Sequence, residues 1–266
     1  MADEAPRTDW NAAVYDRIGT PMRGWAQQLI DDLELRGDET LLDAGCGSGS
    51  VTLDLLQKLP DGKVYAVDSS PDMIANLEKE LAERGITNVV ALTASLTDFT
   101  LPERVDVVFS NAVFHWVPDD DGLFGSLARA TKPGGRLRAQ CGGAGNIARL
   151  RAATHAVEDS APYSEHLSGD SEFRKYRSVE EARAAMERNG WRDVRGNLFE
   201  APVTFDDEDA AVLYLRTIIL QHQAEALQEE LSDRFLRHVI AETVERSGAP
   251  FSADYVRLDL WATRAG

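Results

Sequence analysis

Leu41-Leu-Asp-Ala-Gly-Cys-Gly-Ser-Gly49 is the most informative segment of this 266-residue chain. A short apolar run ends in a carboxylate, and a loop with three glycines follows at once. Beyond the loop, apolar residues recur at helical spacing until Pro60-Asp-Gly62 ends the pattern. Glycine lets the backbone turn sharply or approach a ligand, and a helix N-terminus offers free N–H groups. The segment therefore predicts a strand, a glycine loop and a helix, which open a nucleotide-binding βαβ unit.

An acidic residue closes the next expected strand. Lys63 to Val67 has the composition of a strand, and Asp68 follows it. This acid lies about 20 residues beyond the glycine loop, the spacing at which such a carboxylate reaches the ribose hydroxyls of a nucleotide. Glycines that merely tighten a turn, with an aspartate that merely starts a loop, would explain this combination less well.

Two adenosine-containing cofactors suit such a unit, and two residues distinguish them. The dinucleotide pattern Gly-x-Gly-x-x-Gly/Ala has Ser50 at its third position here. Asp43 stands directly before the loop, where it would repel a pyrophosphate but attract a ligand that carries a sulfonium and an ammonium group. The residues therefore favour S-adenosylmethionine over NAD.

From about Thr40 to Gly143 the sequence resembles the class I S-adenosylmethionine-dependent methyltransferases. The glycine loop is similar to the family's first motif, which wraps the methionine end of the cofactor. Tyr65-Ala-Val-Asp-Ser-Ser-Pro-Asp-Met73 is similar to the second, whose acid holds the ribose. Residues 109–116 and 127–135 are similar to the stretches that end the fourth strand and open the fifth. Within the family, residues 111–119 most resemble the trans-aconitate and carboxyl O-methyltransferase branch, followed by malonyl-thioester methyltransferases.

The resemblance implies a set of cofactor-binding residues. Tyr15 falls where relatives place an aromatic hydroxyl on the cofactor carboxylate, although packing alone explains it equally well, and Arg23 is a further candidate. Ser95 stands where relatives often have an acid for the adenine amino group; a hydroxyl can accept the same hydrogen bond, and Asp98 is the alternative. The full implied set is Tyr15, Asp43, Gly45, Cys46, Gly47, Asp68, Ser69, Met73, Ser95, Leu96, Asn111 and Ala112.

The acceptor side is less determined. Carboxyl pKa values lie at about 4, so a carboxylate acceptor is already ionised at pH 7 and needs no base. A phenol or amine would use one, most often histidine. His115, between Phe114 and Trp116, is the candidate catalytic residue, and a structural histidine is an equally good explanation. The candidate substrate-binding residues are Trp116, His166, Arg174, Arg216 and His222, with Arg177 as a further carboxylate clamp.

Strands that alternate with helices predict an α/β, doubly wound Rossmann-like fold: a mostly parallel seven-stranded sheet with helices on both faces, an antiparallel edge strand and a helical lid. One domain with cap insertions is expected, divided into an N-terminal helical segment over the cofactor site (1–39), a cofactor-binding core (40–145) and the rest of the sheet with the lid (146–266). The expected strands are 40–44, 63–67, 88–92, 105–110, 135–141, 194–205 and 255–262, and the expected helices are 9–33, 49–59, 71–84, 120–131, 146–157, 179–189, 207–229 and 232–247.

Composition narrows the class of partner. A net charge of −17 opposes binding to nucleic acid, which needs a basic surface. The two cysteines, Cys46 and Cys141, have neither metal-ligand nor disulfide spacing, so no metal and a reducing cytoplasm are expected. Cys46 has no paired base and is expected to pack. No apolar run approaches membrane-spanning length, and the first residues do not resemble a signal peptide. The expected partner is a small-molecule acceptor, and a homodimer is an open alternative.

Three classes of function are compatible with these features. The leading hypothesis is an S-adenosylmethionine-dependent methyltransferase that acts on a small molecule at oxygen, either a carboxylate or a hydroxyl. An NAD-dependent oxidoreductase is the second, because Asp68 suits the adenosine ribose of either cofactor. A non-catalytic regulatory module that binds the cofactor is the third, because cofactor-binding residues alone are compatible with it.

Overall fold

The computed structural model describes residues 20–167 and 174–266, with only the backbone for residues 20–23. Of the helix expected over residues 9–33, the described part is α2 (Thr20–Asp31). Tyr15 lies outside the described residues, and so does the side chain of Arg23.

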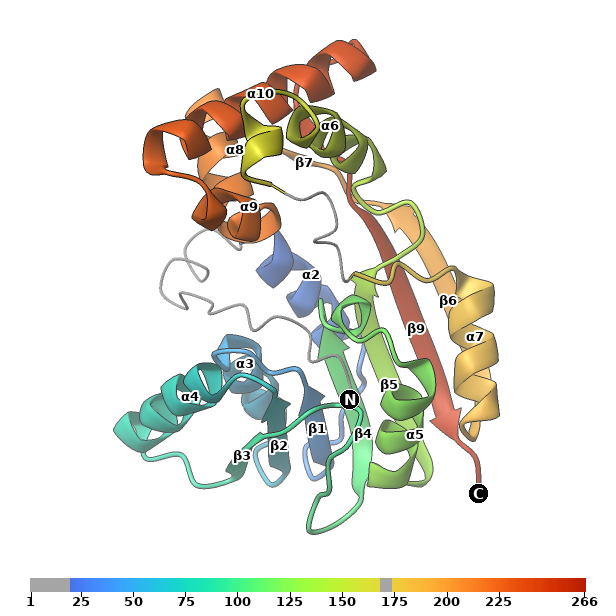
Figure 1. Ribbon diagram of the computed structural model, residues 1–266. Coiled ribbons are helices and arrows are strands. Elements are labelled where there is room, and N and C mark those ends of the chain that lie inside the picture. The colour runs from blue at the N-terminus through green and yellow to red at the C-terminus, as the bar shows by residue number, and fades with distance from the viewer. Residues whose placement is uncertain (1–19, 168–173) are drawn as a thin grey trace.

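A seven-stranded sheet forms the centre of the molecule, with the strands in the order β3-β2-β1-β4-β5-β9-β6 (Figure 1). Strands β1 to β5 are parallel, and β9 runs antiparallel to both of its neighbours. A separate two-stranded ribbon pairs β7 with β8. The bounds are β1 Thr40–Ala44, β2 Lys63–Asp68, β3 Val89–Thr93, β4 Val105–Asn111, β5 Thr131–Gly142, β6 Trp191–Glu200, β7 Val203–Thr204, β8 Ser252–Ala253 and β9 Val256–Arg264.

Two details of the sheet differ from the expectation: the strand expected over residues 194–205 is divided into β6 and β7, and the antiparallel strand has a different place. It was expected at the edge, but β9 lies one place inside it and β6 is outermost. The side chains explain this order: residues 257–260 of β9 are buried on both faces, whereas β6 is largely exposed or half-buried. Its charged residues, among them Arg192 and Asp193, suit an edge strand.

Helices cover both faces of the sheet. Successive side chains of a strand point to opposite faces, and apolar side chains on both faces are buried under helices. Leu41 belongs to the cluster that contains Leu55 and Leu77, from α3 and α4. Its neighbour Leu42 belongs to the opposite cluster, which contains Leu127 and Met186 from α5 and α7. The bounds of these helices are α3 Ser50–Gln57, α4 Pro71–Arg84, α5 Asp120–Ala130 and α7 Val179–Arg188.

A second group of helices, which we call the lid, packs around a hydrophobic cluster of its own. It lies beyond the carboxyl ends of β4 and β5, with α2 between it and the sheet (Figure 1). The helix expected over residues 207–229 is divided, because α8 passes into a π-helical turn before α9 begins. The lid elements are α6 Ala148–Glu158, η2 Tyr163–Glu165, α8 Glu208–Tyr214, η3 Leu215–Ile219, α9 Gln221–Ala226 and α10 Glu229–Ser247.

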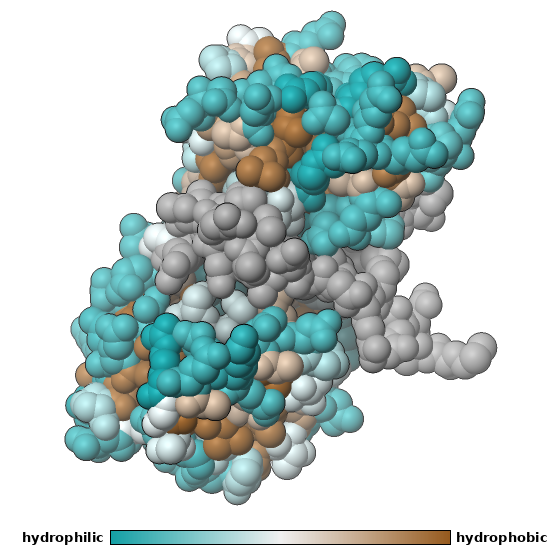
Figure 2. Space-filling model, turned by 90° about the vertical axis from the view of Figure 1, so that its left-hand side faces the viewer, coloured by the Kyte–Doolittle hydropathy of each residue, from teal (hydrophilic) through white to brown (hydrophobic). Residues whose placement is uncertain are grey.

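The described surface on one face of the molecule is chiefly hydrophilic (Figure 2). On the face shown in Figure 2, teal residues predominate and brown areas are smaller and scattered among them. Among the described residues, Leu213 is the large apolar side chain that stands out as exposed. No helix within the described ranges is long and apolar enough to cross a membrane.

Candidate cofactor and acceptor site

The glycine loop after β1 is closed on one side and open on the other. At Gly45, φ is +82°, and an added Cβ would lie 2.3 Å from a methyl of Val113, so only glycine fits. At Gly47, φ is +53°, and an added Cβ would meet no atom of the described residues within 4 Å. Within the described part of the chain, the backbone at Gly47 therefore borders open space, as a loop that receives a ligand should.

Asp68, at the end of β2, fixes this loop from the side. One carboxylate oxygen accepts the Gly47 N–H at 2.9 Å, and the other accepts the Ser70 N–H at 2.9 Å. Each oxygen has a second lone pair that these bonds do not use. Asp68 can therefore brace the loop and still accept hydrogen bonds from a ligand.

Asp43, the fourth residue of β1, is a buried carboxyl group with one neutral partner. Its side chain accepts a hydrogen bond from Thr52 Oγ1 at 2.7 Å, and the residue is 2% exposed. Burial raises its pKa to about 7; the hydrogen bond from Thr52 opposes this rise, and the charge of Asp68 adds to it. A cation that binds near the loop would favour the ionised form of Asp43.

Cys46 contributes backbone to the loop and a packed side chain. Its N–H donates to Val67 O at 3.1 Å, and its thiol is buried. Burial, together with the charges of Asp43 and Asp68, raises the pKa of the thiol well above its ordinary value. Cys46 is therefore a neutral packing group and no nucleophile, as the sequence indicates. Cys141 is also a buried free cysteine, and burial raises its pKa to about 11.

The segments after β2 and β3 carry the residues expected around ribose and adenine. Met73 and Leu96 are buried, whereas Ser69 and Ser95 are exposed. The Ser95 hydroxyl lies 2.8 Å from the Thr97 hydroxyl, so it already has one partner. The fallback candidate Asp98 is exposed as well, and its N–H donates to Ser95 O.

The end of β4 contacts the glycine loop and continues into the acceptor side. Asn111 is the last residue of β4. Ala112 has φ +61°, and its N–H donates to Gln140 O at 2.7 Å. Val113 then packs against Gly45, which places the next residues beside the loop. These residues form the short 3-10 helix η1 (Phe114–Trp116).

His115 is buried and neutral, and its surroundings select one tautomer. Its Nδ1 accepts the N–H of Gly142 at 3.3 Å, so the proton of the neutral ring is assigned to Nε2. Burial lowers its pKa well below the ordinary value, and the charges of Arg257, Arg174 and Arg177 lower it further. In this state the free side of the ring donates a hydrogen bond and does not take a proton.

Aromatic and cationic side chains surround the His115 ring. It stacks on Tyr176 and lies tilted against Trp116. The Arg174 guanidinium lies 4.5 Å from the centre of the Trp116 ring, and Arg257 lies 4.5 Å from the centre of the Trp25 ring. The structure thus gathers candidates from η1, the segment before α7, and β9.

Three residues of this aromatic and cationic group were not among the candidates from the sequence: Arg257, Tyr176 and Trp25. Arg257 is 2% exposed, and its Nε donates to Gln140 Oε1 at 3.1 Å. The signal that could have found it is an arginine near the start of the closing strand, Val256–Arg264, in which apolar and polar residues alternate.

Three expected substrate-binding residues lie elsewhere on the lid. Arg216 donates to Ser232 Oγ at 3.0 Å and pairs with Asp233 at 3.5 Å, so its partners are on α10. His166 and His222 are exposed, the first after η2 and the second on α9. A role for these residues in acceptor binding stays a prediction.

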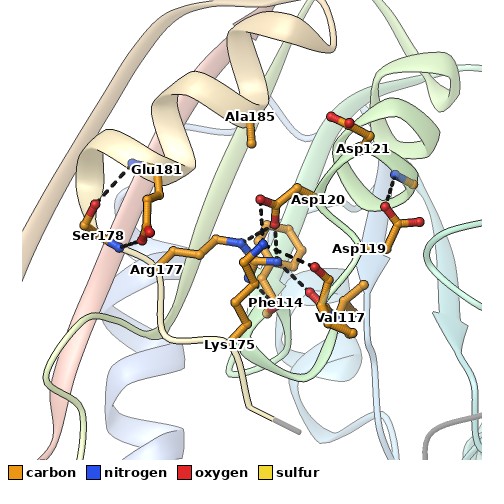
Figure 3. Close-up of polar contacts among 12 residues, drawn as sticks. Phe114, Val117, Asp119, Asp120, Asp121, Lys175, Arg177, Ser178, Glu181 and Ala185 are labelled. Carbon is orange, nitrogen blue, oxygen red and sulfur yellow. Dashed lines mark hydrogen bonds and ion pairs between the residues drawn. The ribbon is translucent and has the colours of Figure 1, made fainter. Parts of the chain in front are cut away.

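Arg177, expected as a carboxylate clamp, is used internally instead. Its guanidinium donates to the carbonyls of Phe114 and Val117 and pairs with Asp120 (Figure 3). The residue is 1% exposed, so its planar fork is filled by the protein itself.

Neither metal ligands nor the surface hollow on the lid points to another centre. Within residues 20–167 and 174–266, no group of three or more His, Cys, Asp or Glu side chains could hold a metal ion. A cavity of about 720 Å³ lies on the lid between Tyr163 and α10, and none of the candidate residues lines it. It is open to solvent, so the chemistry is better located from the loop and from His115.

Together, the sheet order, the glycine loop after β1 and the acid after β2 define the Rossmann-like fold of class I methyltransferases. Residues 41–135, less than half of the chain, match the family described as "Methyltransferase domain". The resemblance and the fold class expected from the sequence are therefore confirmed, and the oxidoreductase hypothesis is not favoured.

Relatives and solved structures agree with this class. The chain is 31% identical over 132 residues to a trans-aconitate 2-methyltransferase from Acidovorax ebreus. The aligned region covers 50% of this chain and 49% of the relative. It is 27% identical over 167 residues to a malonyl-[acyl-carrier protein] O-methyltransferase from Ilyobacter polytropus, which covers 62% and 63% of the two chains. The matches thus span about half to three-fifths of these relatives.

Two solved structures share the fold at low sequence identity. The YcgJ protein from Bacillus subtilis has a TM-score of 0.64 at 15% identity and covers 92% of this chain and 99% of its own. A geranyl diphosphate C-methyltransferase from Streptomyces coelicolor, solved with S-adenosyl-L-homocysteine, has a TM-score of 0.59 at 18% identity, over 98% and 88%. At this identity they establish the fold alone.

Proposed function

We propose that this chain is an S-adenosylmethionine-dependent methyltransferase that methylates a carboxylate oxygen of a small molecule. The observation that carries the proposal is the open backbone at Gly47, whose N–H is bonded to Asp68 and which lies four residues after the buried Asp43. Two carboxyl groups at one loop suit a cationic ligand and oppose a diphosphate.

The residues present fit this cofactor. The unused lone pairs of Asp68 can accept both ribose hydroxyls, and the buried carboxyl of Asp43 offers a negative charge for the cationic methionine end. Gly47 leaves room for the backbone to approach the ligand, and Gly45 lets Val113 pack closely against the loop. The cofactor would supply a methyl group already activated on a sulfonium. The chain's own task is then to align the acceptor and exclude water.

His115 makes a carboxylate the better acceptor. A phenol or an amine must lose a proton, but His115 presents its Nε2–H and keeps Nδ1 on the Gly142 N–H. A carboxylate is already ionised and can accept that hydrogen bond. Arg174 and Arg257 add positive charge on the same side, and the rings of Trp116 and Tyr176 limit access of water. Names of the relatives, which include a trans-aconitate and a malonyl-thioester methyltransferase, support this acceptor class.

Calorimetric titration with S-adenosylmethionine and S-adenosylhomocysteine tests the cofactor. Transfer of a labelled methyl group to a panel tests the acceptor, with trans-aconitate and other small di- and tricarboxylates compared with phenols and amines. We expect binding of both cofactor forms and label in carboxylate esters. No heat with either form would refute the cofactor, and label confined to phenols or amines would refute the acceptor class. Cofactor binding without transfer to any acceptor would favour the regulatory-module alternative.

A further inference from the structure

Residues 174–178, which we call the strap, run from the lid to the start of α7 alongside η1. The Lys175 N–H donates to His115 O at 2.8 Å, and the Ala144 N–H donates to Arg177 O at 2.8 Å. The strap main chain is thus bonded to η1 on one side and to the segment after β5 on the other. At its end, Ser178 caps α7 in a capping box with Glu181 (Figure 3).

The Arg177 side chain bonds to main-chain carbonyls on either side of His115. It donates to Phe114 O at 2.7 Å and to Val117 O at 2.5 Å, and its Nε donates to Asp120 at 2.7 Å. The two carbonyls belong to the residue before His115 and to the residue two positions after it. Charge-assisted bonds from a buried, planar guanidinium hold both ends of η1 at a fixed separation.

Asp120 balances the charge of the strap. Lys175 Nζ donates to its second oxygen at 2.8 Å and to Pro118 O at 3.3 Å. Burial alone would raise the pKa of Asp120, but hydrogen bonds from Lys175 and Arg177 hold it below the ordinary value. Asp120 is also the first residue of α5, so the network joins η1, α5 and the strap in one unit (Figure 3).

The lid end of the strap contacts both the lid and Trp116. Arg174 donates to Ile219 O at 3.0 Å, and its guanidinium lies over the Trp116 ring. Ile219 is the last residue of the π-helical turn η3, and such turns widen a helix and often occur at functional sites. One arginine therefore connects the lid to the residue next to His115.

We infer that the strap is the positioning element of the acceptor site, in which Arg177 fixes η1 so that His115 keeps Nδ1 on the Gly142 N–H and reserves Nε2–H for the acceptor. This inference rests on the proposed function for the identity of the acceptor, but its structural part does not. Arg177 touches neither cofactor nor acceptor in this scheme. It acts through the main chain of Phe114 and Val117.

Arg177→Lys is the decisive variant, with Arg237→Lys as its matched control. Lysine keeps the charge and can reach Asp120, but it has no planar fork for two carbonyls as well. Arg237 also bonds to carboxylates, those of Glu208, Asp209 and Asp233, but it lies on the lid surface. The measurements are nitrogen-15 NMR signals of the His115 ring, assigned with His115→Gln, cofactor affinity by calorimetry, and kcat and KM for trans-aconitate as the probe acceptor.

In Arg177→Lys we expect the His115 ring to leave the single Nε2–H tautomer and the KM of trans-aconitate to rise about tenfold, with cofactor affinity changed less than about twofold. Arg237→Lys should leave all three readouts unchanged. A lower melting temperature with unchanged His115 signals would overturn the inference, because Arg177 would then be merely structural. The ring signals are read without turnover. Absence of methylation by the unmutated protein would therefore count against the proposed function, while the NMR comparison would still decide the role of Arg177.

Discussion

Asp43→Asn makes the electrostatics of the glycine loop measurable. Burial raises the pKa of Asp43 from 3.8 to about 7. Between these values the folded protein holds a proton that the unfolded chain has lost, so the free energy of unfolding should fall as pH rises through this window. The difference amounts to about 4 kcal/mol over the whole window, and about 3 kcal/mol of it falls between about pH 5 and pH 8. Asparagine cannot ionise, and its carbonyl can still accept the hydrogen bond from Thr52.

The assay is urea unfolding of both proteins at a series of pH values. We expect the stability of Asp43→Asn relative to the unmutated protein to increase steadily from pH 5 to pH 8, by up to about 3 kcal/mol. Asp61→Asn, at an exposed aspartate in the turn before β2, is the control and should show no such trend. A stability difference that stays constant with pH would refute the buried, proton-holding state of Asp43.

The affinity for the cofactor should rise with pH, whereas the free energy of unfolding falls. A cation beside the loop stabilises ionised Asp43, so S-adenosylmethionine should release a proton on binding and should bind more tightly at pH 8 than at pH 6. Asp43→Asn should lose this pH dependence and bind more weakly. Calorimetry in two buffers that differ in ionisation enthalpy measures the released proton directly, and equal heats in both would contradict the linkage.

Three further substitutions test separate parts of the site. Asp68→Ala should weaken cofactor binding by about 1–3 kcal/mol, measured by calorimetry, because it removes acceptors for the ribose and the brace on Gly47; unchanged affinity would place the ribose elsewhere. Gly45→Ala should destabilise the fold by about 1–3 kcal/mol in thermal unfolding, since its Cβ would lie 2.3 Å from Val113 at φ +82°. Adding Val113→Ala should recover only part of that loss, and full recovery would show that the backbone is not strained. Arg174→Gln should raise the KM of a carboxylate acceptor about tenfold with cofactor affinity unchanged, and an unaltered KM would remove Arg174 from the acceptor site.

Local sequence signals predicted the first half of the fold well. Helix α4 begins and ends where Pro71 and Gly85 indicate, because proline suits the first turn and glycine adopts the left-handed cap at φ 66°. Pro202 separates β6 from β7, as expected for a residue that lacks the N–H of a strand. The division of residues 207–229 was missed, because no glycine or proline marks the π-helical turn.

The sequence could propose a cofactor side because its candidate residues lie in short motifs, whereas the contacts of the candidate acceptor side join distant residues. His115 receives its hydrogen bond from Gly142, 27 residues away, and Arg177 binds the carbonyl of Phe114, 63 residues away. Both contacts involve main-chain groups, which every residue carries, so no residue type in the sequence identifies them. For the same reason, the sequence suggested that Arg177 binds the acceptor carboxylate, whereas in the structure it bonds to main-chain carbonyls of the protein itself.

Opposite charges near the glycine loop and near His115 explain why one chain would bring together a cationic donor and an anionic acceptor. Asp68 makes the side of the glycine loop negative, and Asp43 adds to this charge when a bound cation favours its ionised form. Burial lowers the pKa of His115, the charges of Arg257, Arg174 and Arg177 lower it further, and the ring stays uncharged. An imidazolium in that place would be repelled by these arginines, and a neutral donor adds polarity without adding charge. Such a site favours an acceptor that brings its own negative charge, and it needs no base, because nothing has to be deprotonated. Exchange of the acceptor for its methyl ester or amide should therefore abolish binding to the arginine side while cofactor affinity persists, and equal binding of acid and ester would contradict this division of charge.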